Sequence, residues 1–316
     1  MRRTLIGIVI ATLAVVGIVA QGAALDVLPQ IPRIVANVRV DGRLLYVARG
    51  QIKEWAGGAS RALTQPGVRY ESAEYSPDGT VIAASEVGDN HSDIILLDAT
   101  GSRMRSLTRH WSNVSISQSA WGRTPSWSPD GARIAYASDL GGTDMSLWTV
   151  GRGGGDNRRI WTLPLGSAGL DFPAWSPDGD QIAFVSYSGG LLAPSQVYVL
   201  TPARGTVAKV TDVEHGAFDP SWSPDGRTIA YVARVGATTE IRVLTPGGSV
   251  DRRITEGHVD RSPVYSPNGQ ELAFLRSDGV TFDLYAVAIG IDGVSEPRRL
   301  TSGEDADGIS GISWRR

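Results

Sequence analysis

One five-residue pattern, an aromatic residue followed by Ser-Pro-Asp-Gly or Ser-Pro-Asn-Gly, constrains this 316-residue chain more than any other feature. Its copies are separated by 43 to 52 residues and begin at Tyr75, Trp127, Trp175, Trp222 and Tyr265. Self-similarity at such a period is typical of solenoids and propellers, in which each repeat is one supersecondary unit. The sequence therefore predicts a repeat architecture before any single motif suggests an activity.

Within one repeat, turn residues alternate with strand-like runs. After Trp127, Pro129 presets φ for a tight turn, Asp130 suits the next position and Gly131 tolerates a positive φ. The strand-like runs that follow, separated by glycine-rich breaks, are 133–139, 146–150 and 158–162. With the stretch that ends at Trp127 they make four antiparallel strands.

The closing strands outnumber the complete turns. Six strands end in an apolar residue followed by threonine, at Thr64, Thr108, Thr162, Thr211, Thr255 and Thr301. Residues 40–64 supply three strands without a preceding turn motif, and residues 309–314 supply an opening strand with nothing after it. Joined, they complete a sixth unit and leave few open sheet edges. We predict an all-β, six-bladed β-propeller over residues 40–316, closed by strands from both termini.

This combination of Trp-Ser-Pro-Asp-Gly turns, apolar-Ala-aromatic strands and Leu-Thr closures resembles the TolB-type propeller family, whose repeat is also called PD40. The resemblance covers nearly the whole chain after the N-terminal segment, and it implies a six-bladed fold that commonly serves interaction. The chain departs from this resemblance in one respect. TolB itself resembles a two-part protein with an α/β domain before the propeller. Residues 26–39 are too few for such a domain. We therefore carry over the fold and not the Tol-Pal role.

The N-terminus predicts export. Arg2 and Arg3 precede an uncharged apolar run from Leu5 to Ala20 that continues, interrupted by Gln21, to residue 25. The segment fits a signal peptide cleaved near Ala24, and it also approaches the ~20 apolar residues that a membrane anchor needs. Both interpretations place the propeller outside the cytoplasm. We expect residues 1–25 to be a signal anchor or signal peptide, with the retained anchor slightly favoured, and residues 26–39 to be a tether.

Composition and motifs exclude several functions. A net charge of −3 opposes an electrostatic nucleic-acid footprint. The absence of cysteine excludes disulfides and thiol catalysis, and no Gly-x-Ser-x-Gly nucleophile elbow occurs. The turn role explains the acidic residue of each repeat and its one replacement by Asn: Asp78, Asp130, Asp178, Asp225 and Asn268. The sequence thus favours a protein that is not an enzyme and needs no cofactor.

One alternative is enzymatic. Seven positions before the aromatic residue of three consecutive repeats stand His215, His258 and Asp307. Two histidines and a carboxylate on one rim would suit a divalent metal, which would support a metal-assisted carbohydrate lyase or hydrolase working at the channel mouth. The simpler interpretation is that all three are polar loop residues on an exposed face.

Two features favour a binding module. Charged residues that would ring one entrance of the channel stand four positions before the aromatic residue, or directly after that position in the case of Asp219. They are Glu71, Arg123, Asp171, Asp219 and Arg261. The longest loop, 110–123, carries Trp111 and Trp121 in a serine-rich stretch, as a lid or as a recognition surface. Our leading hypothesis is a monomeric extracytoplasmic module that binds a cell-envelope protein or peptide. A small polar ligand is a further possibility.

Overall fold

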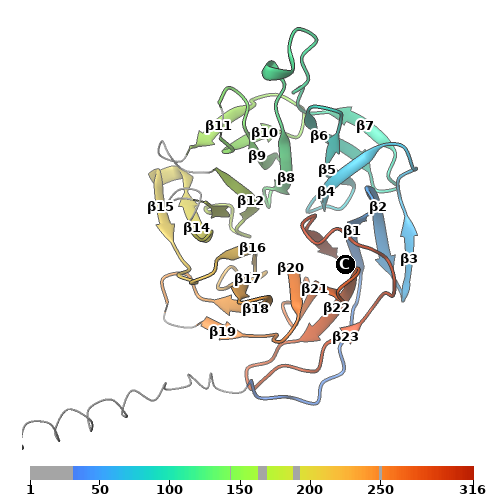
Figure 1. The fold of residues 1–316 in the computed structure, drawn as a ribbon, viewed down its shortest axis with the longest axis vertical. Coiled ribbons are helices and arrows are strands. Elements are labelled where there is room, and N and C mark those ends of the chain that lie inside the picture. The colour runs from blue at the N-terminus through green and yellow to red at the C-terminus, as the bar shows by residue number, and fades with distance from the viewer. Residues whose placement is uncertain (1–30, 143, 163–168, 188–192, 249–250) are drawn as a thin grey trace, which may run out of the picture.

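Six four-stranded antiparallel sheets surround a common centre (Figure 1). The computed structural model describes residues 31–142, 144–162, 169–187, 193–248 and 251–316. In this part of the chain, helical structure consists of two short 3-10 turns, η1 (Ile116–Gln118) and η2 (Pro202–Arg204). The predicted all-β, six-bladed propeller is confirmed.

Each blade runs from an inner strand beside the axis to an outer strand at the rim. The first three blades contain β4 (Arg69–Tyr75), β5 (Val81–Val87), β6 (Ser92–Asp98) and β7 (Arg103–Ser106); β8 (Gly122–Trp127), β9 (Arg133–Ser138), β10 (Ser146–Gly151) and β11 (Arg158–Trp161); and β12 (Leu170–Trp175), β13 (Ile182–Ser186), β14 (Gln196–Thr201) and β15 (Thr206–Lys209). The next two contain β16 (Ala217–Trp222), β17 (Ile229–Val235), β18 (Thr238–Leu244) and β19 (Asp251–Arg253); and β20 (Val259–Tyr265), β21 (Glu271–Ser277), β22 (Phe282–Ala288) and β23 (Arg298–Arg299).

The sixth blade joins the two ends of the described chain. Its sheet order is β24 (Ile312–Arg315), β1 (Arg43–Ala48), β2 (Gln51–Ala56) and β3 (Ala59–Ala62). In the antiparallel register between β24 and β1, Leu44 lies opposite Trp314. The indole Nε1 of Trp314 also donates a hydrogen bond to the Asp41 carbonyl at 2.9 Å. This blade closes the ring, as the surplus closing strand predicted.

The Ser-Pro-Asp-Gly segments form the turns between the first and second strands. In the first copy, the Ser76 hydroxyl donates to Asp78 Oδ1 at 2.6 Å and accepts from the Val81 amide at 3.1 Å. Asp78 Oδ1 also accepts from the Thr80 amide at 2.9 Å. These hydrogen bonds hold the pKa of Asp78 well below its usual range. The same contacts recur in the other copies, with Asn268 in the acidic position of the fifth, so the turn role is confirmed.

The Leu-Thr closures also have a structural cause. The threonine Oγ1 accepts the amide hydrogen of a residue on the third strand of the same blade, at 2.9 to 3.0 Å in five of the blades. In the first blade, for example, Ile94 donates to Thr108. The hydroxyl thereby satisfies a buried amide where the outer strand ends.

The aromatic residues of the inner strands connect neighbouring blades. Trp127 Nε1 donates to the Glu74 carbonyl of the preceding blade at 3.3 Å, and Trp222 Nε1 donates to the Ala174 carbonyl at 3.1 Å. Trp127 also packs with Val81 of the preceding blade in one hydrophobic cluster. Burial of each such ring contributes roughly 1.5–3 kcal/mol, so the repeated aromatic stabilises the joint between blades.

The segment before the propeller packs against the fifth blade. The Ile34 amide donates to the Val294 carbonyl at 3.0 Å, and the Val294 amide donates to the Pro32 carbonyl at 3.0 Å. Val38 is buried against Ala286 and Ala288. Part of the predicted tether therefore lies on the propeller. Residues 1–30, including the predicted signal segment, lie outside the described residues. Within the described residues, no helix is long and apolar enough to span a membrane.

Candidate functional site at the channel mouth

The inner strands share a backbone irregularity three positions before the aromatic residue. The residue there has a positive φ in five blades: Thr124 (47°), Phe172 (53°), Asp219 (50°), Ser262 (52°) and Gly311 (76°). The strand register shifts at the same place in the four blades with a non-glycine residue. A β-bulge redirects side chains, and a non-glycine residue in the left-handed region costs about 1 kcal/mol or more. This recurrent strain lies at the end of the channel opposite the Ser-Pro-Asp-Gly turns.

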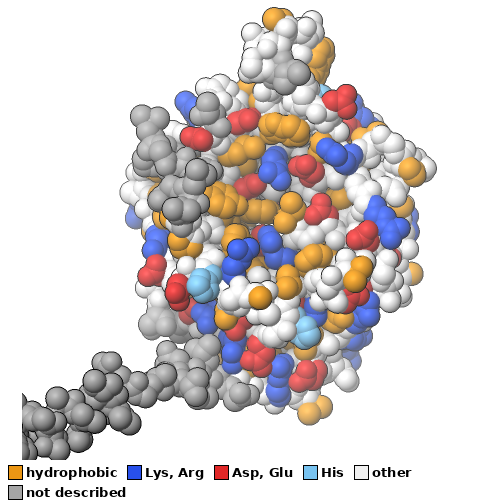
Figure 2. All heavy atoms as spheres, viewed as in Figure 1, with side chains coloured by type: hydrophobic (Ala, Val, Ile, Leu, Met, Phe, Trp, Pro, Cys, Tyr) orange, Lys and Arg blue, Asp and Glu red, His pale blue; other side chains and the backbone are white. Residues whose placement is uncertain are grey.

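The five charged residues predicted to ring the entrance do gather beside these bulges. We call Glu71, Arg123, Asp171, Asp219 and Arg261 the charged mouth. Arg123 lies between two acids, with Nε 3.3 Å from Glu71 Oε2 and Nη1 3.6 Å from Asp171 Oδ2. Arg261 forms a two-pronged ion pair with Asp219, at 2.7 and 3.1 Å. Figure 2 shows acidic and basic side chains close together around the centre of the viewed face.

The mouth is partly withdrawn from water. Burial raises the pKa of Asp171, while the Arg123 charge and the Thr124 hydroxyl, 2.6 Å from Oδ1, oppose this rise. Burial also raises the pKa of Tyr187 to about 12, and the negative charges of Asp171 and Asp219 add to the rise. The Tyr187 phenol is thus protonated at neutral pH, within reach of the charges of Asp171 and Asp219.

The sequence pattern missed two residues of this surface, Arg234 and Tyr187. Phe218 has the guanidinium of Arg234 5.3 Å from its ring centre and that of Arg261 at 5.5 Å, within the range of a cation–π contact. Arg234 and Tyr187 lie on or just after the second strands of their blades, so an alignment on the inner strands does not reveal them. Phe218 itself occupies the aligned position four residues before Trp222.

The long loop with two tryptophans does not cover the channel. In Figure 1 it is the teal-to-green loop between β7 and β8, and it extends outward from the disc. Trp111 is 42% exposed, with the Arg109 guanidinium 4.4 Å from its ring centre. Trp121 is half-buried at the foot of the loop, where its amide donates to Asp139 Oδ1 at 2.7 Å. The structure therefore gives the two indoles different surroundings, one largely exposed and the other half-buried.

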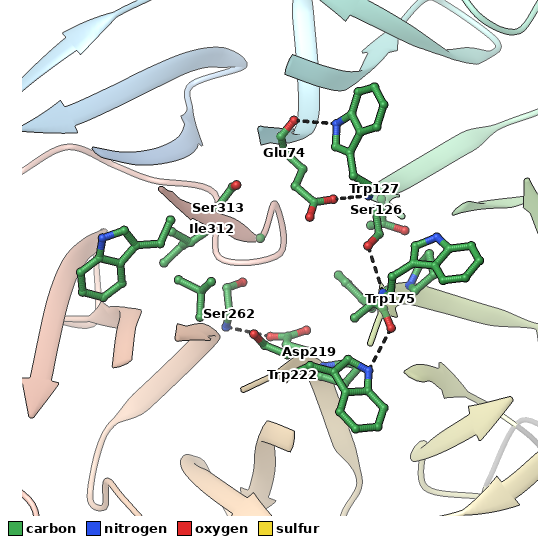
Figure 3. A pocket seen from close by; sticks show the side chains of 18 of the residues that line it. Glu74, Ser126, Trp127, Trp175, Asp219, Trp222, Ser262, Ile312 and Ser313 are labelled. Carbon is green, nitrogen blue, oxygen red and sulfur yellow. Dashed lines mark hydrogen bonds between the residues drawn. The ribbon is translucent and has the colours of Figure 1, made fainter. Parts of the chain in front are cut away.

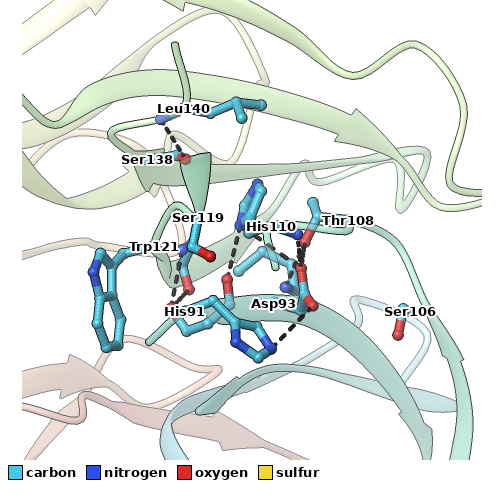
Figure 4. A network of polar contacts seen from close by, with 12 residues as sticks. His91, Asp93, Ser106, Thr108, His110, Ser119, Trp121, Ser138 and Leu140 are labelled. Carbon is cyan, nitrogen blue, oxygen red and sulfur yellow. Dashed lines mark hydrogen bonds and ion pairs between the residues drawn. The ribbon is translucent and has the colours of Figure 1, made fainter. Parts of the chain in front are cut away.

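A buried polar network fixes the base of that loop (Figure 4). Asp93 Oδ1 accepts hydrogen bonds from the Thr108 hydroxyl at 2.9 Å and from the His110 amide at 2.7 Å. His110 Nδ1 lies 2.7 Å from the Ser92 carbonyl, and the Ala120 amide donates to the His110 carbonyl at 2.9 Å. Because both ends of the loop are held, its protruding part is presented from a fixed base.

The residues of the predicted metal set lie on separate loops. His215 and His258 are exposed, and the His258 carbonyl accepts from the Thr239 amide at 2.8 Å. Asp307 Oδ1 accepts from the Ile309 amide at 3.2 Å. Among the described residues, no three His, Asp or Glu side chains lie close enough together to hold a metal ion. Equal spacing in the sequence thus does not bring these three together as one ligand set.

Behind the mouth lies a cavity of about 300 Å³ (Figure 3). All six inner strands contribute to its wall, which combines proline rings with serine hydroxyls. The indoles of Trp127, Trp175 and Trp222 point outward between the blades (Figure 3). It extends from the bulged residues, such as Phe172, to the prolines of the turns, such as Pro177. The cavity is therefore the central channel of the propeller.

Comparison with known proteins agrees with this architecture. The family model described as TolB beta propeller domain (PD40) matches residues 117–306, more than half of the chain. The chain belongs to the TolB β-propeller family. No curated protein sequence matches this chain.

Several solved structures share the fold. TolB from Acinetobacter baumannii superposes with a TM-score of 0.64 at 22% identity, over 83% of this chain and 67% of that one. A putative TolB from Agrobacterium tumefaciens gives 0.63 at 20% identity, over 86% and 93%. A propeller in a nidogen/laminin complex gives 0.63 at 10% identity, over 86% and 97%. At these identities the likeness concerns the fold.

Proposed function

We propose that this TolB-family propeller is a non-enzymatic, extracytoplasmic protein-binding module that receives a polar segment of a cell-envelope protein at its charged mouth. The observation that carries the proposal is that five charged side chains from five different blades meet at one opening, over recurrent bulges. Charge complementarity at such a surface gives specificity and faster association. A similar propeller occurs in a nidogen/laminin complex, which supports a protein partner.

Two parts of the mouth have different roles in this proposal. The side chains of Asp219 and Arg261 are 4% and 18% exposed, so their ion pair holds neighbouring blades together. The side chains of Glu71 and Arg123 are 32% and 31% exposed, and their Nε–Oε2 distance of 3.3 Å is long enough for exchange with a partner. A partner segment that carries both charge signs would replace this weak contact at little cost.

We propose display at the cytoplasmic membrane through residues 1–25, on the basis of the two N-terminal arginines and the apolar run. Fractionation of cells followed by N-terminal sequencing tests this location. An intact N-terminus in the membrane fraction supports the anchor, whereas a new N-terminus near Ala24 in the soluble exported fraction supports cleavage. Full-length protein confined to the cytosol would contradict both.

Site-specific photocrosslinking of the full chain in intact cells tests the binding surface. A benzophenone amino acid at Phe172 probes the mouth, and the same group at Asp180, an exposed residue after a turn at the opposite end, is the control. We expect one polypeptide, identified by mass spectrometry, to attach at position 172, and its capture to fall at least tenfold in Arg123→Gln. Equal capture at both positions would place the interface elsewhere, with the Trp111 loop as the next surface to probe.

A further inference from the structure

The charge balance of the central cavity is one-sided. Of the described residues that line it, Glu74 and Asp219 are acidic and none is Lys, Arg or His. Asp219 is neutralised by Arg261, whose guanidinium approaches it at 2.7 Å from outside the lining. Glu74 has no ion-pair partner among the described side chains. One carboxylate therefore faces the cavity without a counter-ion.

Glu74 is held in place by neutral groups. Its Oε2 accepts the Trp127 amide hydrogen at 2.9 Å (Figure 3). Burial raises the pKa of Glu74 to about 8, although hydrogen bonds from Trp127 and Ser126 lower it. An ionised carboxylate in such surroundings is costly unless a cation accompanies it.

The charge is not needed for the contact that Glu74 makes. The residue directly before the aromatic in the other five blades is Ser126, Ala174, Ser221, Val264 or Ser313. Ser126 accepts the Trp175 amide hydrogen at 3.3 Å, and Ser313 accepts that of Tyr75 at 3.1 Å. A serine thus makes the same link between blades, and the carboxyl group of Glu74 adds an ionisable acid inside the channel.

We propose that the central cavity binds an organic cation, an alkylammonium or guanidinium group, with Glu74 as its counter-ion. The proline rings of the wall suit the alkyl stem of such a group. A volume of about 300 Å³ lies at the lower end of small-molecule pockets and fits one such group with its stem. The cation is either a free small amine or a basic side chain of a polypeptide that enters through the charged mouth. This inference does not depend on the protein partner proposed above.

Titration of the purified propeller with small probes tests the site directly. Butylguanidinium and butylammonium are the cationic probes, and 1-butanol is the neutral control. Calorimetry measures affinity, and tryptophan fluorescence reports on the cavity because Trp127, Trp175, Trp222 and Trp314 line it. We expect both cations to bind saturably at one site and butanol to show no saturation. Binding should also release protons near pH 7, seen as a dependence of the heat on the buffer.

Two variants with the same change of charge separate the site from general electrostatics. Glu74→Gln keeps an oxygen that accepts the Trp127 amide hydrogen, and we expect it to weaken cation binding at least tenfold. Asp180→Asn removes an exposed acid outside the cavity lining and should leave binding unchanged. Thermal unfolding confirms that each variant is folded. Equal affinity in wild type and Glu74→Gln, or equal binding of butanol, would overturn the proposal.

A third titration identifies the source of the cation. The peptide Gly-Gly-Arg-Gly-Gly presents the same guanidinium group on a polypeptide. Tenfold tighter binding of the peptide than of butylguanidinium supports a protein segment, whereas weaker binding supports a free small amine. Failure of all three cationic probes would remove the site and leave the crosslinking test of the charged mouth intact.

Discussion

The two ends of the inner strands follow the same symmetry and carry different information. At the turn end, every copy has nearly the same residues, and these satisfy one another, as Ser128 and Asp130 do at 2.6 Å. At the mouth end, the aligned positions carry acids, arginines and a phenylalanine, which contact residues of other blades across 42 to 52 positions of sequence. Repeated residues thus build the ring, and the positions that differ between blades give the channel its chemistry.

The largest effect should come from breaking the buried ion pair of the mouth. Asp219→Ala leaves the Arg261 guanidinium without its carboxylate and removes the acceptor of the Ser262 amide, 3.0 Å away. Loss of one partner of a buried pair costs about 3–5 kcal/mol. Urea unfolding should therefore show a much lower midpoint with an unchanged slope. A loss below 1 kcal/mol would mean that the pair is not structural and that the division of the mouth into two parts fails.

The second effect concerns Glu74 and pH. Its folded-state pKa is raised from 4.5 to about 8, so the folded state keeps a proton that the unfolded chain has already lost. Stability from this group is present below pH 4.5 and is lost as the pH rises to about 8, at up to about 1.4 kcal/mol per pH unit. Glu74→Gln removes this loss. We expect the variant to match the wild type near pH 4 and to exceed it by a few kcal/mol at pH 9.

Chemical unfolding at several pH values, taken as the difference between the two proteins, measures this effect. The four histidines are common to both proteins, so any contribution from them cancels in the difference. The other charged side chains of the inner strands are likewise common to both proteins: Arg69, Glu71, Arg123, Asp171, Asp219, Asp260, Arg261 and Arg315. A difference that does not change with pH would show that Glu74 is ionised and already solvated.

The same contrast explains what the sequence could predict. Ring closure follows from counting repeats, and the charged mouth follows from aligning them, because inner-strand positions lie beside the axis and converge there. His215, His258 and Asp307 are equally well aligned, but they lie in the loops before β16, β20 and β24, where equivalent positions stay apart. Glu74 was missed because the alignment considered charges four residues before the aromatic and not directly before it. Its burial depends on contacts with the next blade.

A smaller effect is expected at the turns. Ser128→Ala removes the acceptor of the Arg133 amide and the donor to Asp130, at 2.9 and 2.6 Å. The loss should be about 1–2 kcal/mol, because a part-buried amide is left without its partner. Asp130→Asn should have little effect, since Asn268 fills the same place in the fifth copy. Thermal unfolding distinguishes the two variants, and a larger loss for Asp130→Asn would show that the turn needs its charge.

The smallest effect on stability should come from the residues with the largest proposed effect on binding. Glu71 and Arg123 are about one-third exposed, and their contact of 3.3 Å is partly open to solvent, so Glu71→Gln should change stability by less than about 0.5 kcal/mol. Arg123→Gln should cost about 1 kcal/mol, because it also removes the cation 3.6 Å from the buried carboxylate of Asp171. Partner capture at Phe172 should nevertheless fall at least tenfold in Arg123→Gln. If both variants keep full stability and full capture, the differences between blades at the mouth do not encode recognition. If Arg123→Gln instead unfolds the protein, its contact with buried Asp171, at 3.6 Å, is a structural link like that between Asp219 and Arg261.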